Sequence, residues 1–415
     1  MATLHTRDAP PACALTLFLL AGCGGGGGSS ASAGQVDAPD PPGPGLAIRT
    51  SSPALLQVPP APNVLPIALG RGPRGTAFNS PFVSVTVCVP GTATCQTIDQ
   101  VLLDTASSGL RIAASALRSD MDLPSLRTAE GAPVSQCVAF ASGAAWGSVR
   151  RADVRLAGEQ AQAITIQVYE RAAPSSPRRP GACGTASDIA QVIDANGVLG
   201  VGLRRQDCGT ACESANPAAG YFACGGAPCT PTPGARAQQV GNPIAALGAH
   251  NNGLAVLLPP VPPGGSSAVT GAAILGIATQ SNNGLGAAGV FAPDAEGFLA
   301  ARYSGSTYRS FLDTGTNSVR FPDAELPLCG EFYCPSQPGS LSATISSAGG
   351  ASQDVELAFE SPAGISPDAV GAPIAGGSRS GRFVNWGLPF FFGRTVHLAI
   401  EGAETPVGPG PYWAF

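Results

Sequence analysis

Two aspartates, Asp104 and Asp313, stand out because each lies within a copy of one repeated pattern. The segments VLLDTASSGLRI (101–112) and SFLDTGTNSVRF (310–321) both contain Leu-Asp-Thr, then a small, a hydroxyl, a polar and a small residue, and both end in apolar-Arg-apolar. A lone Asp-Thr-Gly triplet is more often a turn former than a catalytic group. Two copies of the longer pattern predict two related structural units with an equivalent aspartate in each.

Two carboxylates can do chemistry together if the fold brings them face to face. At a separation of about 3 Å they cannot both ionise, so they share one proton and titrate as a pair. One then removes a proton from a bridging water, which attacks a peptide carbonyl, while the other protonates the carbonyl oxygen. This chemistry needs no metal, no cofactor and no covalent intermediate, and we expect none.

Each aspartate ends an apolar run, so the fold must place it at the end of a strand. Hydrophobic residues make up 44% of the 415 residues and charged residues 12%, with 55 Gly, 40 Pro and no Lys, which favours short strands and turns. One helix is predicted over 242–250, with Asn-Pro at its start and Asn-Asn-Gly after its end. The predicted strands include FVSVTVCV (82–89), QVLLDT (100–105), AITIQVY (163–169), AVLLPPV (255–261), AAILGI (272–277), RSFLDT (309–314) and RTVHLAI (394–400).

The N-terminal residues 1–22 have the features of a signal peptide. An early Arg precedes a short apolar run over 12–21, and small residues precede Cys23. The run is too short to span a bilayer, which takes about 20 residues. Leu-Ala-Gly-Cys (20–23) resembles the bacterial lipobox, so Cys23 is the predicted lipidation site. A plain secretory peptide with a chance cysteine is the alternative.

A tether and two lobes are expected after the signal peptide. Residues 23–66 are rich in Gly, Ser and Pro, so they are interpreted as a flexible tether that carries the lipid anchor. The remainder divides into an N-terminal β lobe at 67–240, with a Cys-rich insertion, and a C-terminal β lobe at 241–415. The residue after the predicted lipidation site is Gly24 and not Asp, which resembles the pattern of lipoproteins sorted to the outer membrane. We therefore expect a lipid-anchored protein of the cell envelope, in the outer membrane and facing the periplasm or the cell surface.

The cysteines favour an oxidising compartment. Twelve are present, and the loss of Cys13 with the signal peptide and the use of Cys23 for lipid leave ten, an even number. A zinc site among residues 208–229 is the alternative, which the lack of a CxxC pair disfavours. The predicted bridges are Cys88 with Cys95, Cys329 with Cys334, Cys137 with Cys183, and two among Cys208, Cys212, Cys224 and Cys229.

Beyond the two motifs, the sequence resembles the bilobal pepsin-like aspartic peptidases over most of residues 80–415. VLGVGL (198–203) resembles the segment that closes lobe one beside the first catalytic Asp. NPIAALGAHNNGLAVLL (242–258) and AVTGAAILGI (268–277) resemble the family's helix, strand and entry to lobe two, and WGLPFFFGRTVHLAI (386–400) resembles the segment that closes lobe two. The resemblance implies an all-β, two-lobed pepsin-like aspartic-protease β-barrel architecture with few short helices.

Carried over position by position, the resemblance assigns a role to each residue of the two motifs. The catalytic pair would be Asp104 and Asp313, which activate a water molecule. Thr105 and Thr314 would hydrogen-bond to each other across the interface between the lobes. Ser107 and Thr316 would support the carboxylates.

FASGAAWGSVRRADVRLAG (140–158) resembles the flap hairpin that folds over substrate, so Phe140, Gly143 and Trp146 are the predicted flap residues. Two residues depart from the family's pattern. Ala106 replaces a Gly, although it keeps the backbone N–H and fits if its φ is not positive. Phe140 falls where the flap usually has Tyr, whose hydroxyl would hydrogen-bond near the attacking water.

The implied function is a membrane-tethered aspartic endopeptidase that binds a peptide or protein substrate in the cleft between the lobes, as a monomer. The first alternative is a proteolytically inactive envelope lipoprotein that uses the same fold for binding or structure. The second is an unrelated β-sandwich adhesin with chance Asp-Thr pairs, which would lack a two-fold relation between lobes.

Other functions are disfavoured by composition. No basic run is present, so nucleic acid is not an expected partner. His5 lies in the signal peptide, which leaves only His250 and His397 for a Ser-His-Asp triad. Arg111 and Arg320 are equivalent in the repeat and are interpreted as lobe caps, with a bias of the cleft toward acidic ligands as the alternative.

Overall fold

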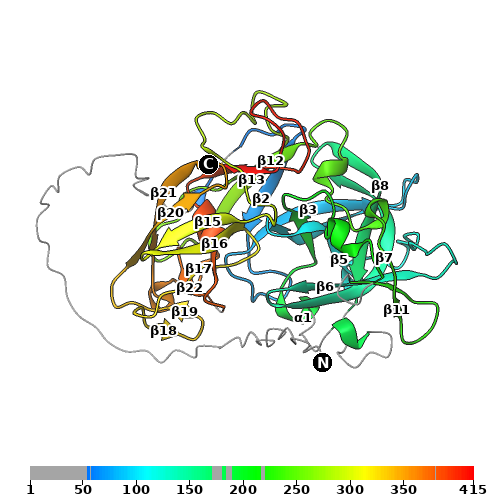
Figure 1. Cartoon of the computed structure of the whole chain (residues 1–415), viewed down its shortest axis with the longest axis horizontal. Helices are drawn as coiled ribbons and strands as arrows, with labels where there is room; N and C mark the ends of the chain where they lie inside the picture. Colours follow the sequence, from blue (N-terminus) through cyan, green and yellow to red (C-terminus); the bar gives the residue numbers. More distant parts are fainter. Residues whose placement is uncertain (1–53, 57, 171–179, 184–188, 216–219, 379) are drawn as a thin grey trace, which may run out of the picture.

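The computed structural model describes residues 54–56, 58–170, 180–183, 189–215, 220–378 and 380–415 (Figure 1). The predicted signal peptide, the predicted lipidation site Cys23 and most of the predicted tether lie outside these residues. In the part of the chain that is described, no helix is long and apolar enough to cross a bilayer. The predicted all-β class is confirmed, because two sheets form the body.

The larger sheet has 16 strands and continues from the N-terminal lobe into the strands that end the chain. β1 (Ala54–Leu55) pairs with β13 at its side. The other strands, in spatial order, are β11 (Thr230–Pro231), β10 (Tyr221–Ala223), β6 (Val134–Phe140), β7 (Gly143–Leu156), β8 (Glu159–Tyr169), β5 (Ser108–Ala113), β9 (Gly197–Val201), β4 (Cys95–Asp104), β3 (Pro81–Cys88), β2 (Val64–Leu69), β13 (Val269–Leu275), β12 (Gly253–Leu257), β24 (Thr395–Ala399), β25 (Tyr412–Ala414) and β14 (Val290–Phe291).

The smaller sheet has nine strands and forms the second lobe, on the left of Figure 1. Its strands, in spatial order, are β18 (Leu328–Cys329), β19 (Phe332–Tyr333), β22 (Ala375–Gly377), β17 (Val319–Phe321), β23 (Phe383–Gly387), β16 (Ser306–Asp313), β15 (Leu299–Tyr303), β20 (Gly339–Ser346) and β21 (Ser352–Phe359).

Helices in the described residues are short. In the described part of the chain the one α-helix is α1 (Ile189–Val192), and the 3₁₀ turns include η1 (Ala114–Ala116), η2 (Gly181–Cys183), η3 (Gly209–Cys212), η5 (Arg236–Gln238), η6 (Ile244–Ala246), η7 (Pro362–Gly364) and η8 (Leu388–Phe391).

The helix predicted over 242–250 was wrong in length, because only η6 forms there. Asn242 Oδ1 accepts a hydrogen bond from the Ile244 N–H at 3.0 Å, as a helix start requires. Leu247, however, is already extended at φ −68° and ψ 157°, which ends the turn before Gly248.

The two lobes repeat one strand arrangement. The order β3-β4-β9-β5-β8-β7-β6 in the first lobe corresponds to β15-β16-β23-β17-β22-β19-β18 in the second. Successive pairings in both series are antiparallel, parallel, antiparallel, parallel, antiparallel and antiparallel. An unrelated β-sandwich with chance Asp-Thr pairs would not produce this duplication.

The hydrophobic core runs through both lobes. It includes Val85 and Leu199 of the larger sheet, Leu312 and Val384 of the smaller sheet, and Phe390 of η8. Full burial of such side chains contributes about 1.5–3 kcal/mol each. Because one core supports both lobes, the positions of the two motifs relative to each other are set by packing.

The predicted boundary at residue 67 falls within β2 (Val64–Leu69). β2 begins at Val64, before the predicted boundary at residue 67, because its apolar side chains are buried against β3 and β13. The strands β12, β13, β14, β24 and β25 come from the predicted C-terminal lobe, yet they extend the larger sheet. The lobes therefore share a sheet.

The predicted disulfides are confirmed, and the zinc alternative is excluded because the four clustered cysteines are oxidised in pairs. Trp146 and Phe222 pack against the bridges of the Cys-rich insertion, with ring centroids 5.7 Å apart. The five bridges are Cys88–Cys95, Cys137–Cys183, Cys208–Cys212, Cys224–Cys229 and Cys329–Cys334.

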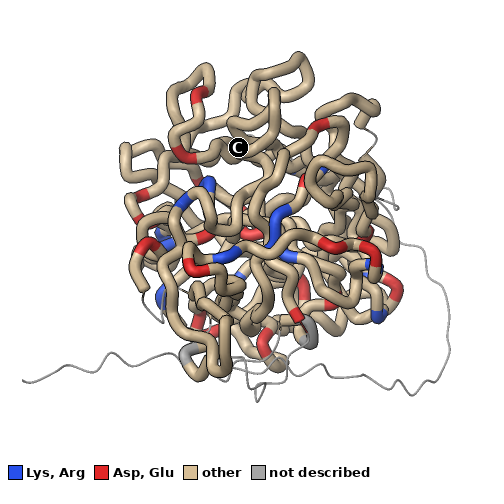
Figure 2. The backbone as a smooth tube through the Cα atoms, turned by 90° about the vertical axis from the view of Figure 1, so that its right-hand side faces the viewer, with Lys and Arg blue, Asp and Glu red and all other residues tan. Residues whose placement is uncertain are grey.

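Charged residues are sparse and mixed in sign over the molecule (Figure 2). Several of the basic ones lie in the middle of the view, next to acidic residues, and not in a separate basic face.

Candidate active site

Asp104 and Asp313 occupy equivalent places at the ends of β4 and β16. Each pairs with a glycine of the parallel neighbour strand, Gly200 on β9 and Gly387 on β23. A Cβ on Gly200 would lie 2.8 Å from Ser107 Oγ, and a Cβ on Gly387 would lie 2.2 Å from the Ser318 carbonyl oxygen. These glycines therefore let the turn after each aspartate approach the neighbouring strand.

The first carboxylate is held by the turn that follows it. Asp104 is 7% exposed, and its Oδ1 accepts a hydrogen bond from the Ala106 N–H at 2.9 Å. Its Oδ2 accepts a hydrogen bond from Ser107 Oγ at 2.5 Å. Ala106 is not among the residues with positive φ, so its replacement of Gly causes no backbone strain.

The second carboxylate is held in the same way, with one additional donor. Asp313 is 8% exposed, its Oδ1 accepts from the Gly315 N–H at 2.9 Å, and its Oδ2 accepts from Thr316 Oγ1 at 2.6 Å. Asn385 Nδ2 on β23 donates a further hydrogen bond to Oδ2 at 2.8 Å. Sequence reasoning missed Asn385, and no spacing signal points to it.

The two threonines bind the lobes to each other. Thr105 N–H donates to Thr314 Oγ1 at 3.1 Å, and Thr314 N–H donates to Thr105 Oγ1 at 3.0 Å. Each hydroxyl also donates to the carbonyl that precedes the other aspartate, that of Leu312 at 3.0 Å and that of Leu103 at 2.7 Å. The carboxylates are thus fixed relative to each other by buried, reciprocal bonds.

The carboxylates lie close enough to interact electrostatically. One point, the position that a Cβ on Gly315 would take, lies 3.0 Å from Asp104 Oδ1 and 3.2 Å from Asp313 Oδ1. Burial first, and then the negative charge of Asp104, raise the pKa of Asp313 to about 6, although hydrogen bonds from Thr316, Asn385 and Gly315 act in the opposite direction. Such a pair can hold one proton at mildly acidic pH.

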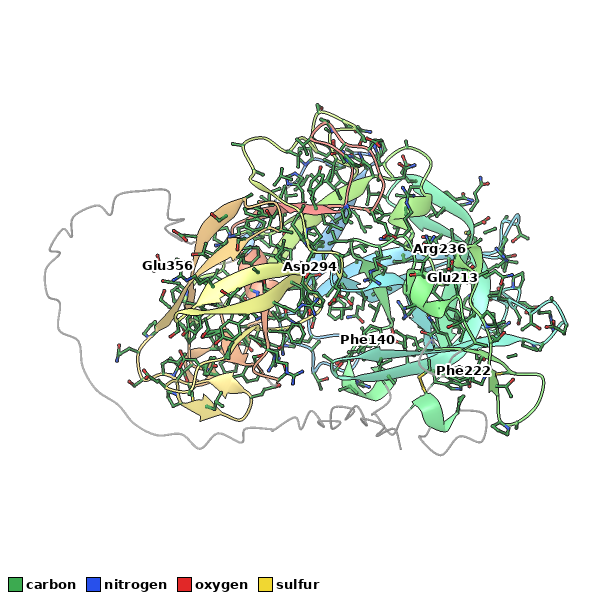
Figure 3. All side chains as sticks on the ribbon, viewed as in Figure 1. Phe140, Glu213, Phe222, Arg236, Asp294 and Glu356 are labelled. Atoms are coloured by element: carbon green, nitrogen blue, oxygen red, sulfur yellow. A yellow bond between two sulfur atoms is a disulfide. The ribbon has the colours of Figure 1, made fainter. Side chains whose placement is uncertain are left out.

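A cleft of about 710 Å³ contains both carboxylates and is lined by both lobes. The β6–β7 hairpin contributes Val138, Phe140 and Ser142 to its wall. Phe140 and Asp294, from opposite lobes, lie near the middle of the molecule (Figure 3). The hairpin thus reaches the cleft with a phenyl ring and no phenol hydroxyl.

Two of the predicted flap residues do not line the cleft. Gly143 is buried opposite Phe140 in the hairpin register. Trp146 is 4% exposed, packs against Phe222 and is not among the residues that line the cleft. The reason is that β10 of the Cys-rich insertion pairs with β6 and brings Phe222 to the back of the hairpin.

The second lobe provides an aromatic wall that the sequence did not predict. Phe298, Phe311 and Phe383 line the cleft, with ring centroids 5.5 to 6.2 Å apart. Asp294 and Glu296 lie on the same side, where both form ion pairs with Arg309. Aromatic side chains spaced along three separate segments give no local motif, so only the fold brings them together.

The described residues contain no group of three or more His, Cys, Asp or Glu side chains arranged to hold a metal ion. The arrangement can instead hold a water molecule between two carboxylates, one of which has a raised pKa.

Comparison with curated proteins gave no match. The family model described as "Protein of unknown function (DUF3443)" matches residues 59–415, which is most of the chain and includes both Asp-Thr motifs, the hairpin and the Cys-rich insertion. The start of this match agrees with the start of the folded body just before β2. The chain therefore belongs to the family described as "Protein of unknown function (DUF3443)".

Proposed function

We propose that this protein is an aspartic endopeptidase, in which Asp104 and Asp313 activate a water molecule that hydrolyses a peptide bond. The observation that carries the proposal is the duplicated support of two close carboxylates, each held by the N–H and the hydroxyl of its own turn. The resemblance of residues 80–415 to pepsin-like aspartic peptidases, and the repeated strand order, support the same conclusion.

The raised pKa of Asp313 supports one assignment of the two roles. Below about pH 6 Asp313 carries a proton, so it acts as the acid and Asp104 acts as the base. Asp104 takes a proton from the water, the water oxygen bonds to the peptide carbonyl carbon, and Asp313 donates its proton to the carbonyl oxygen. In the second step Asp104 protonates the leaving nitrogen, the C–N bond breaks, and a hydroxyl of the intermediate returns a proton to Asp313.

The substrate would be an extended peptide lying in the cleft between the lobes. The aromatic wall formed by Phe298, Phe311 and Phe383 and the ring of Phe140 would contact apolar side chains of that peptide. The protein would act as a monomer, attached to the envelope by lipid on Cys23 and held away from the membrane by the Gly- and Pro-rich segment that follows. A Cys23→Ser variant should lose both incorporation of labelled palmitate and sedimentation with membranes.

One observation favours a second candidate function, a proteolytically inactive envelope lipoprotein that uses the cleft to bind a ligand. Phe140 lines the cleft from the hairpin and brings no hydroxyl to it. In the aspartic peptidases that the sequence resembles, a tyrosine in the flap supplies that hydroxyl.

Peptide cleavage by the full-length protein in detergent decides between the two functions. An unbiased peptide library would be incubated with wild type, Asp104→Asn and Asp313→Asn between pH 3 and 7. Asp99→Asn is the matched control, because Asp99 lies on the same strand as Asp104 but is exposed and does not line the cleft. Cleavage by wild type and the control, lost in both pair variants, would support the endopeptidase. No cleavage by folded wild type at any pH would favour the inactive binding protein.

A further inference from the structure

Arg111 lines the cleft but takes no part in the proposed hydrolysis. It lies on β5, the strand that follows Asp104, and is 1% exposed. Its Nη1 donates hydrogen bonds to the carbonyl oxygens of Ser108 at 2.9 Å and Gly109 at 3.2 Å. A buried guanidinium is costly unless it is paired, so its burial in the wall of the cleft indicates a specific role.

Asp207 supplies the paired charge and joins Arg111 to the hairpin. Arg111 Nη2 donates to Asp207 Oδ2 at 3.2 Å. The same oxygen accepts a hydrogen bond from Gln136 Nε2 on β6, and Asp207 Oδ1 accepts one from the Tyr221 hydroxyl on β10 at 3.1 Å. The ion pair is therefore attached both to the first strand of the hairpin and to the Cys-rich insertion.

Arg111 also contacts the end of β6 directly. Its guanidinium carbon lies 5.7 Å from the centroid of the Phe140 ring, inside the range of about 6 Å for a cation–π contact. Phe140 offers no hydrogen-bonding group, so the ring depends on this contact and on apolar packing for its position. The hairpin is thus linked to the strand that follows Asp104 at two points, the Phe140 ring and the Gln136 amide.

We propose that Arg111 is a positioning residue: paired with Asp207, it holds Phe140 and the hairpin tip in place over the cleft that contains Asp104 and Asp313. This inference rests on the proposed function for its catalytic consequence, but the geometry of the hairpin can be tested without any activity. Loss of the cation should loosen the tip and weaken peptide binding, while the carboxylates keep their own supports.

The second lobe contains the same contact outside the cleft. Arg320, at the equivalent position of the repeat, lies 5.7 Å from the Phe332 ring centroid and forms an ion pair with Glu331 at 2.8 Å. Arg320 and Phe332 do not line the cleft. The Arg320→Met substitution therefore removes a similar contact from a similar hairpin and serves as the matched control.

Amide hydrogen exchange of the full-length protein tests the positioning directly. In Arg111→Met, exchange at residues 139–142 should rise about tenfold, and Phe140→Leu should have a similar effect. Arg111→Lys, which keeps a cation, should restore most of the protection, and Arg320→Met should leave these residues unchanged. Because Arg111→Met leaves the buried Asp207 carboxylate unpaired, the Arg111→Met/Asp207→Asn double variant provides the same test with a smaller risk of unfolding.

Kinetics on a cleaved peptide provide the second measurement. Arg111→Met should raise KM about tenfold with a smaller change in kcat, and Arg111→Lys should lower KM toward the wild-type value. Unchanged exchange at 139–142 in folded Arg111→Met would overturn the positioning role, whether or not the protein cleaves peptides. Increased exchange in Arg111→Met, together with a wild type that cleaves no peptide, would instead retain the positioning role and remove the endopeptidase.

Discussion

Thr105 and Thr314 hydrogen-bond to each other in both directions across the interface between the lobes. Each backbone N–H donates to the hydroxyl of the other threonine, at 3.1 and 3.0 Å. Each hydroxyl then donates to the carbonyl one residue before the opposite aspartate. Both residues are almost completely buried, so water cannot replace these bonds.

Thr314→Val should therefore destabilise the protein more than its small change in shape suggests. The variant leaves the Thr105 N–H and the Leu103 carbonyl without their partner, and buried unsatisfied groups cost about 1–3 kcal/mol each. We expect the free energy of unfolding in urea to fall by roughly 2–4 kcal/mol. Thr314→Ser keeps the hydroxyl and is the control, with a loss of about 1 kcal/mol from the missing methyl. Equal stability of Thr314→Val and wild type would contradict the role of this contact.

The asymmetry between Ala106 and Gly315 leads to a second prediction. A Cβ on Gly315 would lie 3.0 Å from both Asp104 Cγ and Asp104 Oδ1, in the space where a shared water would sit. Gly315→Ala should reduce kcat/KM about a hundredfold through this displacement. Ala106 is exposed and its φ is not positive, so Ala106→Gly should change activity by about twofold at most. Similar activities for the two variants would show that the water does not occupy this position.

Much of the site could be predicted from the sequence because its main parts are local and duplicated. Asp104 and Asp313 each carry their own supporting N–H and hydroxyl within three residues, so one short pattern describes each half of the site. The short disulfides were also predictable, since a spacing of a few residues leaves few alternative partners.

The parts that could not be predicted depend on contacts between distant segments. Asn385 reaches Asp313 only because β23 pairs in parallel with β16, and no periodicity in either strand indicates that neighbour. Trp146 faces Phe222 because the Cys-rich insertion adds β10 to the hairpin. When both faces of a strand are covered, both carry apolar residues, so the sequence of the strand does not show which way a side chain points. The position of Trp146 therefore depends on the insertion and not on the sequence of its own strand.

Asp194 provides a stability prediction away from the carboxylate pair. Its oxygens accept hydrogen bonds from the backbone N–H groups of Arg74 and Thr76, both at 2.8 Å, and from the Thr76 hydroxyl. Although burial alone would raise the pKa of Asp194, these bonds hold it below its usual value. Asp194→Ala should lower the free energy of unfolding at pH 7 by about 2–3 kcal/mol.

The pH dependence of that effect distinguishes Asp194 from an exposed ion pair. A carboxyl with a lowered pKa in the folded state stabilises the protein above its unfolded pKa, and the contribution is lost as the pH falls through the folded pKa. The difference between wild type and Asp194→Ala in urea unfolding should thus narrow below about pH 4. Asp120→Ala is the control, because Asp120 pairs with Arg118 in full exposure and should have little effect at any pH. A difference independent of pH would contradict this account.

The raised pKa of Asp313 predicts that cleavage falls as the pH rises through about 6, because the acid then loses its proton. Two substitutions should move the pKa of Asp313 in opposite directions. Asn385→Leu removes a hydrogen-bond donor that lowers the pKa of Asp313, so the decline in cleavage should move to higher pH. Asp104→Asn removes the charge that raises this pKa, so the carboxyl of Asp313, followed by carbon NMR in the labelled protein, should titrate at lower pH than in wild type.

The stability of the protein provides a third measure of the Asp313 pKa. A pKa that is raised in the folded state favours the folded state at low pH and disfavours it above about pH 6, so Asp313→Asn should increase the melting temperature at pH 7 but not at pH 3.5. An Asp313 titration unaffected by either substitution would mean that the two carboxylates do not share a proton.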